Sequence, residues 1–202
     1  MKIREMTDEA FVREIAALLA RVQSWSLRLS GIQPDFSLTP HSVSYLDGSG
    51  EQPFPLALEL KRIWDYARGT GPRPAEQREI IQDLCELLWC PIGAVGEYTI
   101  PAWWWDTPLG QMCLMAQVRA AIEHGEAISA DEFAVLADLT GQRIRQMCAA
   151  GEIKAKKVRR EENSQLEWAI PAKEAVRFLK ARDLWHGERK APERREEQRN
   201  EV

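Results

Sequence analysis

The stretch from residue 128 to residue 182 constrains the fold more than any other part of this chain, because cap and turn residues divide it at short intervals. Ser129-x-x-Glu132 forms a capping box, in which each side chain accepts a hydrogen bond from a backbone amide that a helix start leaves without a partner. Thr140 can cap a second helix a few residues later, and Gly151 can end that helix in the left-handed conformation. The two helices follow each other with almost no spacer, which forces them to cross steeply.

After the second helix, the spacing of apolar residues changes to one that favours strands. Apolar and polar residues alternate in part over residues 153–158, and a second segment with partial alternation follows at residues 165–170. Residues 159–164 between them are polar, so the three segments predict a β-hairpin. Pro171 then opens a last helix, whose apolar residues are expected to return to the core: Ala175, Val176, Phe178 and Leu179. The predicted order of elements is helix, tight turn, helix, hairpin, helix.

The second of these helices, residues 140–150, has an apolar face and a polar face. Three apolar residues recur at helical spacing and are expected to pack inward: Ile144, Met147 and Cys148. The outward positions hold Gln142, Arg143, Arg145, Gln146 and Ala149. Arginine can bridge two acceptors on guanine, and glutamine can pair with the donor and acceptor edge of adenine. In DNA-binding proteins with two steeply crossing helices, residues near the start of the second helix reach base edges in the major groove of DNA. Gln142, Arg143 and Gln146 are therefore the predicted base-reading residues.

A second set of residues is predicted to contact the DNA backbone: Thr140, Arg145, Lys154, Lys156, Lys157, Arg159 and Arg160. In an extended strand Lys154 and Lys156 would share one face and meet phosphates. The two arginines stand at or near the tip of the hairpin, where a hairpin can enter the minor groove. Glu161 and Glu162 share that tip and would repel phosphate there.

Two groups of residues in this stretch follow a pattern found in known DNA-binding proteins. The first group is Ala134, Ala137, Leu139, Thr140, Ile144, Arg145, Met147, Gly151, Glu152 and Ile153, and the second is Trp168, Ile170, Pro171, Glu174, Ala175, Val176 and Leu179. With them the stretch resembles the excisionase and MerR-type winged helix-turn-helix family over about 55 of the 202 residues. The resemblance implies a recognition helix in the major groove and a hairpin, the wing, on the neighbouring backbone. Asp138 and Gly141 depart from the pattern, in which glycine and a polar or basic residue are common at these two positions.

The charge of the chain is distributed unevenly. The formal net charge is −4, which by itself argues against a general binder of polyanions. Residues 139–181, however, contain ten Lys and Arg and five Glu, a local charge of about +5, whereas residues 1–138 contain eleven basic and twenty acidic residues, a charge of −9. A basic unit on an acidic body is typical of a localised polyanion site.

The chain is predicted to be mainly α, with a helical body over residues 1–125 before a C-terminal winged helix-turn-helix that carries a two-stranded hairpin. Apolar periodicity indicates body helices over residues 8–29, 55–68, 75–89 and 108–124. Thr107 followed by Pro108 marks the start of the last of them. Because this helix leads into the winged helix-turn-helix, residues 126–182, with almost no linker, we expect the two parts to be rigidly coupled. The charged tail, residues 183–202, is expected to be disordered.

Three tryptophans in a row, Trp103, Trp104 and Trp105, cannot all face the same way in a regular element. At least one is therefore expected to be partly exposed or to pack on another segment. Three roles are open for them: packing in the core, a contact with a protein partner, and stacking on unpaired bases. No basic residue lies between Ile92 and Arg119 to hold a nucleic-acid backbone next to such a stack.

Several other classes of protein have no support in the sequence. No apolar run reaches the roughly 18 residues that a membrane span needs. The N-terminal residues include acids and have no apolar h-region, so a secretory signal is not predicted and a cytosolic, cytoplasmic location is expected. The four cysteines and three histidines lack the spacing of a zinc site, and no cofactor or metal is expected. The common phosphate-binding, dinucleotide-binding and hydrolase motifs are absent from the sequence, so an enzyme is not predicted.

The predicted function is sequence-specific binding of double-stranded DNA by a bacterial or phage-type transcriptional regulator. A symmetric homodimer is expected, formed through the helical body, because most such regulators bind DNA as dimers. Two alternatives remain open. One is an excisionase-like architectural factor, which uses the same contacts but bends DNA for a recombinase. The other is an adaptor whose wing and tryptophans bind another protein.

Overall fold

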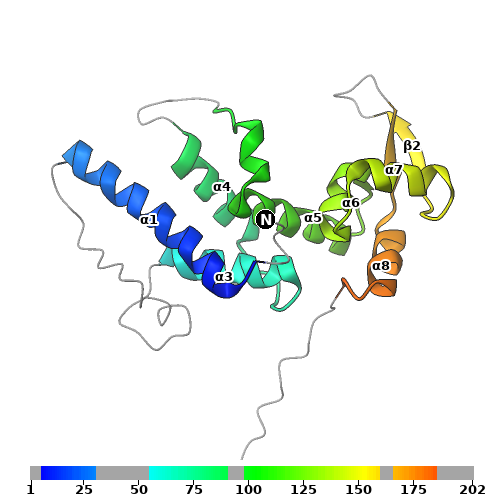
Figure 1. Ribbon diagram of the computed structural model, residues 1–202, viewed down its shortest axis with the longest axis horizontal. Coiled ribbons are helices and arrows are strands. Elements are labelled where there is room, and N and C mark those ends of the chain that lie inside the picture. Colours follow the sequence, from blue (N-terminus) through cyan, green and yellow to red (C-terminus); the bar gives the residue numbers. More distant parts are fainter. Residues whose placement is uncertain (1–5, 31–54, 91–97, 160–165, 186–202) are drawn as a thin grey trace, which may run out of the picture.

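The structure, a computed structural model, describes residues 6–30, 55–90, 98–159 and 166–185, and this part of the chain is mainly helical (Figure 1). The helices are α1 (Asp8–Ser30), α3 (Pro55–Arg68), α4 (Gln77–Trp89), the 3-10 helix η2 (Ala102–Asp106), α5 (Pro108–Glu123), α6 (Ala130–Ala137), α7 (Gly141–Ala149) and α8 (Ala172–Ala181). The strands are β1 (Ile128–Ser129), β2 (Lys156–Arg159) and β3 (Leu166–Ile170). The mainly α fold class is confirmed. Among the described helices, none is both long and apolar enough to cross a membrane.

The N-terminal half of the described chain packs around Trp64 of α3. The Trp64 ring stacks on Phe11 of α1, with 4.8 Å between the ring centroids. Its Nε1–H donates to the Asp8 carboxylate at 3.0 Å, and Arg68 donates to the same oxygen at 2.9 Å. The hydrogen bond from Trp64 and the nearby cations hold the pKa of Asp8 below its ordinary value. These contacts fix the start of α1 on α3, and the bounds of both helices agree closely with those predicted from the sequence.

Helix α5 joins the two halves of the molecule in Figure 1. Its start is capped as predicted, because Thr107 Oγ1 accepts from the Gly110 N–H at 3.1 Å and Pro108 is the first helical residue. The helix packs against α3, η2, α6 and α8, so most of its surface is buried. Gly110 is required at this position, since a Cβ there would collide with the backbone carbonyl of Trp104. Helix α5 therefore lies at the centre of the described fold.

The three strands form one small antiparallel sheet in the order β1-β3-β2. The predicted hairpin is present as β2 and β3. Strand β1 is not predicted by the sequence, because two residues are too few to show an alternation. It forms because Ile128 and Ser129 pair with Ile170 and Ala169 of β3. The sheet therefore ties the residues just before α6 to the residues just before α8.

Strand β2 begins at Lys156, three residues later than the sequence predicts. Ile153 is fully buried, and the Lys154 N–H donates to the carboxylate of Glu174 on α8 at 3.0 Å. This backbone amide is therefore bonded to a side chain and not to a neighbouring strand. The tip of the hairpin, residues 160–165, lies outside the described residues.

The segment after α8 packs back onto the body through Trp185. The Trp185 ring covers the buried guanidinium of Arg119 on α5, with 4.3 Å between the guanidinium carbon and the ring centroid, and the Tyr66 ring lies 5.6 Å away. Burial lowers the pKa of Arg119, and Glu123 opposes this effect from 3.4 Å. The Tyr66 hydroxyl donates to the same carboxylate group at 2.7 Å. Trp185 belongs to the stretch predicted as a tail, and the residues after it lie outside the described part of the chain.

Candidate nucleic-acid interface

The two short helices predicted from the cap residues, α6 and α7, are both present. The capping box is complete, because the Ser129 N–H donates to the Glu132 carboxylate at 2.6 Å and the Glu132 N–H donates to Ser129 Oγ at 3.2 Å. Helix α6 ends at Asp138, which takes the left-handed conformation with a φ of 54°. Thr140 Oγ1 accepts from the Arg143 N–H at 3.2 Å and caps α7. Only three residues separate the two helices, as the sequence predicts.

Helix α7 has the two faces predicted from its sequence. Ile144, Met147 and Cys148 are buried, and burial raises the pKa of the Cys148 thiol. The three predicted base-reading residues are all exposed: Gln142, Arg143 and Gln146. Because the inner face is packed in the core and Thr140 caps the first turn, the backbone under these exposed side chains is held in one place.

Arg145 is also exposed, but its side chain is bonded to a neighbouring helix. Its Nη1 lies 2.6 Å from Oδ1 of Asp131 in the first turn of α6. Gly141 at the start of α7 makes room for this pair, because a Cβ there would overlap the Asp131 carboxylate. Sequence reasoning missed Asp131, since the pair joins residues on two helices whose crossing only the fold defines.

The lysines and arginine of β2 are divided between the two faces of the hairpin. Lys157 pairs with Trp168 across the ladder, and its Nζ lies 5.2 Å from the centroid of the Trp168 ring. Arg159 shares this face, because alternate residues of a strand point the same way. Lys156 points to the opposite face, on which Glu167 also lies. All three cations are exposed, as the prediction of backbone contacts requires.

Lys154 is held in place by α8. Glu174 accepts from the Lys154 N–H at 3.0 Å, and Arg177 donates to both oxygens of Glu174 at 2.6 and 2.8 Å. These bonds, the one from Arg177 foremost, lower the pKa of Glu174 to about 2. Because Lys154 precedes β2, the prediction that it shares a strand face with Lys156 is wrong, although its side chain is exposed. Arg160 lies outside the described residues.

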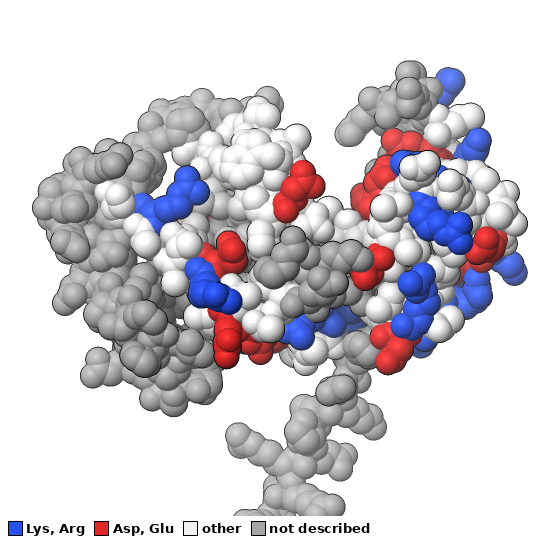
Figure 2. Space-filling model, viewed as in Figure 1, with Lys and Arg blue, Asp and Glu red and all other residues white. Residues whose placement is uncertain are grey.

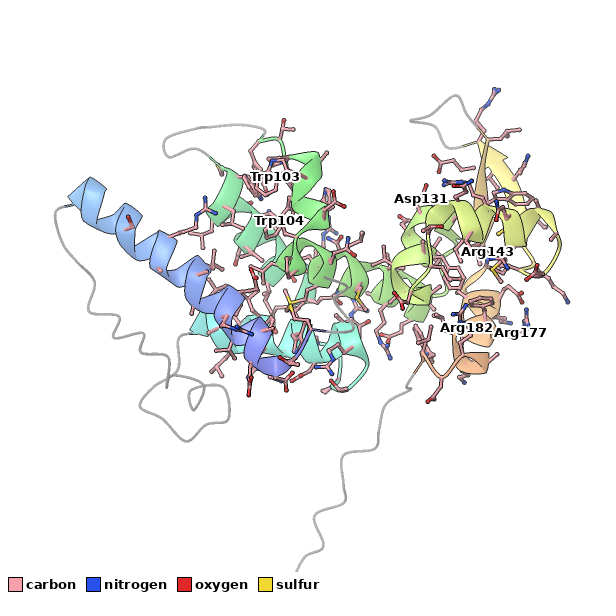
Figure 3. The ribbon with its side chains drawn as sticks, in the orientation of Figure 1. Trp103, Trp104, Asp131, Arg143, Arg177 and Arg182 are labelled. Atoms are coloured by element: carbon pink, nitrogen blue, oxygen red, sulfur yellow. The ribbon has the colours of Figure 1, made fainter. Side chains whose placement is uncertain are left out.

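Helix α8 presents cations that sequence reasoning missed. Lys173, Arg177 and Lys180 recur at i, i+4 and i+7, and all three are exposed. The opposite face of α8 is buried through Ala172, Ala175, Phe178 and Leu179. Figure 2 shows Lys and Arg side chains over α7 and α8, and Figure 3 shows Arg143 on α7, Arg177 on α8 and Arg182 directly after α8. The helical spacing of these basic residues was the signal that could have identified them.

The three adjacent tryptophans belong to η2, and Figure 3 shows Trp103 and Trp104 in the other half of the molecule. Trp103 is 56% exposed, Trp104 is 5% exposed and Trp105 is half-buried, which confirms that they do not all face the same way. Trp103 and Trp104 each make an edge contact with Trp89 of α4, at 5.2 and 5.7 Å between ring centroids. Trp104 is thus a core residue, whereas Trp103 keeps much of its ring at the surface.

Metal ligands do not gather in the described part of the chain, where no group of three or more His, Cys, Asp and Glu side chains could hold an ion. Comparison of the sequence and fold with known protein families, with curated proteins and with solved structures finds no match. The functional interpretation therefore depends on the exposed side chains of α7, the hairpin and α8, and on what such side chains bind.

Proposed function

We propose that the protein binds double-stranded DNA in a sequence-specific way and acts as a transcriptional regulator. In this proposal residues 126–182 form a winged helix-turn-helix, with α7 as the recognition helix and β2–β3 as the wing. The observation that carries the proposal is the exposed face of α7. Gln142, Arg143 and Gln146 lie on it within the first six residues of the helix, directly after the Thr140 cap.

The chemistry of this face fits the edges of base pairs. A guanidinium can donate to both acceptors of guanine, and a carboxamide can both donate to and accept from adenine. Such contacts discriminate between bases only if the side chains start from a fixed backbone. Helix α7 provides one, because Ile144 is fully buried and the Arg143 N–H is bonded to Thr140.

The cations around α7 supply contacts that do not depend on sequence. The exposed cations Lys154, Lys156, Lys157 and Arg159 follow α7 along the chain, and Lys173 and Lys180 are exposed on α8. Lysine and arginine at such positions bind phosphates and fix the register of a protein on the duplex. The acidic residues that predominate before residue 139 would repel DNA from the body and so favour one docking orientation.

A homodimer is part of the proposal, because two copies of α7 related by a two-fold axis would read two half-sites. One observation favours a protein-binding role as an alternative. Trp103 exposes more than half of its surface beside Trp89, and exposed tryptophan is a common hot-spot residue of protein interfaces.

The proposal is tested by selecting sequences that the full chain retains from random duplex DNA. Binding of the selected duplex and of a scrambled duplex of the same length and composition is then measured by fluorescence anisotropy at several salt concentrations. We expect Arg143→Ala to weaken binding of the selected duplex by about 5- to 150-fold and to change binding of the scrambled duplex much less.

The matched control is Arg62→Ala, which removes an exposed cation from α3 of the body and should leave both affinities unchanged. Failure to enrich any sequence, equal affinity for both duplexes, or binding that does not respond to salt would overturn the proposal. Retention of a protein partner by a chain that has no affinity for duplex DNA would favour the alternative.

A further inference from the structure

The ion pair between Asp131 and Arg145 stands beside the face of α7 to which base reading is assigned. Asp131 Oδ1 and Arg145 Nη1 are 2.6 Å apart, and the two side chains are 73% and 48% exposed. Figure 3 shows Asp131 next to the start of α7. The pair lies directly over the first turn of that helix, because a Cβ at Gly141 would meet the Asp131 carboxylate and would stand 3.3 Å from Arg145 Nη1.

The two arginines of α7 therefore differ, although both are exposed and only one residue separates them. Arg145 donates to a carboxylate, whereas the Arg143 side chain makes no ion pair with any described residue. Asp131 occupies Nη1 of Arg145, and its carboxylate repels a phosphate that approaches this guanidinium. Exposed ion pairs contribute little to stability, so removing this pair should leave the fold intact.

We infer that Asp131 limits the sequence-independent affinity of the interface for DNA, an inference that rests on the proposed function. By holding Arg145, Asp131 lowers the attraction of α7 for the backbone of any duplex. Contacts from Gln142, Arg143 and Gln146 to base edges then supply a larger share of the binding free energy than they would if Arg145 also bound a phosphate. Because every duplex offers the same phosphates, this effect lowers the affinity for cognate and non-cognate duplexes alike.

The test compares the selected and scrambled duplexes for the wild-type chain, Asp131→Asn, Arg145→Ala and the double variant. Asp131→Asn should raise the affinities for the scrambled and the selected duplex by about the same factor, roughly 3- to 10-fold, and so leave their ratio unchanged. The dependence of log affinity on log salt should steepen by about 0.9, the amount expected for one more phosphate contact. Arg145→Ala should change scrambled-duplex affinity less than about twofold in the wild-type chain but should abolish the gain in the Asp131→Asn background.

Asp83→Asn is the matched control, because it removes the same charge from an exposed position on α4 of the body. It should raise neither affinity by more than about twofold. The inference is overturned if Asp131→Asn produces no gain, if the gain persists without Arg145, or if the control produces the same gain. Circular dichroism melting curves check that every variant is folded.

The failure of this inference can be distinguished from failure of the proposed function. If the wild-type chain prefers the selected duplex and Arg143→Ala removes that preference, the proposed function holds, and an unchanged Asp131→Asn variant then refutes the role of Asp131 alone. If the wild-type chain prefers no duplex over another, the proposed function fails whatever the Asp131→Asn variant does.

Discussion

The backbone amide of Lys154 donates to the carboxylate of Glu174 at 3.0 Å and joins the entry of the hairpin to α8. Arg177 donates to the same carboxylate, which is 8% exposed. The charged form of Glu174 is thus stabilised only in the folded chain, and its pKa falls from 4.5 to about 2. This carboxylate is therefore one of the contacts that hold the entry of the hairpin against α8.

We expect Glu174→Gln to lower the free energy of unfolding at pH 7 by about 2 kcal/mol. The shift in pKa corresponds to about 3 kcal/mol, and glutamine keeps an acceptor for the Lys154 amide, so the loss is smaller than the full value. A carboxyl whose folded pKa is depressed stabilises the fold above its unfolded pKa of 4.5. This contribution disappears as the pH falls from 4.5 through about 2.

Urea titrations of the wild-type chain and Glu174→Gln at pH 7, and at steps between pH 4.5 and 2, measure this contribution. The difference between the two free energies of unfolding should be constant above about pH 5 and should shrink toward pH 2. Asp83→Asn, an exposed carboxylate on α4, provides the control and should have little effect. A difference that does not change with pH would contradict the assignment.

Two glycines near helix starts should respond to alanine in opposite ways. A Cβ at Gly110 would collide with the backbone carbonyl of Trp104, which cannot move without shifting η2. We expect Gly110→Ala to cost about 2 kcal/mol or more. At Gly141 the obstacle is the end of the exposed Asp131 side chain, and alanine has the higher helix propensity, so Gly141→Ala should change stability by less than about 1 kcal/mol. Thermal and urea denaturation of both variants compare the two costs, and equal costs would contradict this account.

Trp103 and Trp104 are adjacent but should differ greatly in their contribution to stability. Trp104 is buried against Trp89, and Trp104→Ala should cost about 3–5 kcal/mol because it leaves a large cavity. Trp103 is more than half exposed, so Trp103→Ala should cost about 1 kcal/mol or less. Urea denaturation measures both. A loss at Trp103 as large as that at Trp104 would show that its exposed ring is needed for the fold and is not available to a partner.

The helix starts could be predicted from the sequence because caps are local. Ser129, Thr140 and Thr107 each bond to an amide three residues away, so the two partners appear together in any short window. The left-handed end of α6 was not predicted, because Asp138 has a side chain where glycine is the common choice. Strand β1 was not predicted, because its two residues are too few to show an alternation of apolar and polar side chains.

The contacts that define the candidate interface could not be predicted in the same way. Asp131 and Arg145 are fourteen residues apart and meet only because α6 and α7 cross. The bond between Lys154 and Glu174 joins residues twenty positions apart and moves the start of β2. Such pairs depend on how helices and strands pack against one another. The spacing of residue types along the chain does not determine this packing. The exposed face of α7 was predicted correctly because helical periodicity fixes it once its buried residues are known.

The opposite directions of Lys156 and Lys157 lead to the last prediction. Trp168 and Ile170 share one face of β3, which is directed toward the core at the fully buried Ile170, although Leu166 on the same face is 61% exposed. Lys157 lies on that face with its ammonium 5.2 Å from the Trp168 ring, whereas Lys156 lies on the outward face.

We therefore expect Lys156→Ala to weaken binding of the selected and scrambled duplexes alike and to flatten the salt dependence of log affinity by about 0.9. Lys157→Ala should instead lower the free energy of unfolding by about 0.5–1 kcal/mol, through loss of the cation–π contact, with a smaller change in salt dependence. Anisotropy titrations at several salt concentrations and urea denaturation separate the two effects. If both variants flatten the salt dependence equally, the two faces of the hairpin contact DNA to the same extent, and the outward face has no special role.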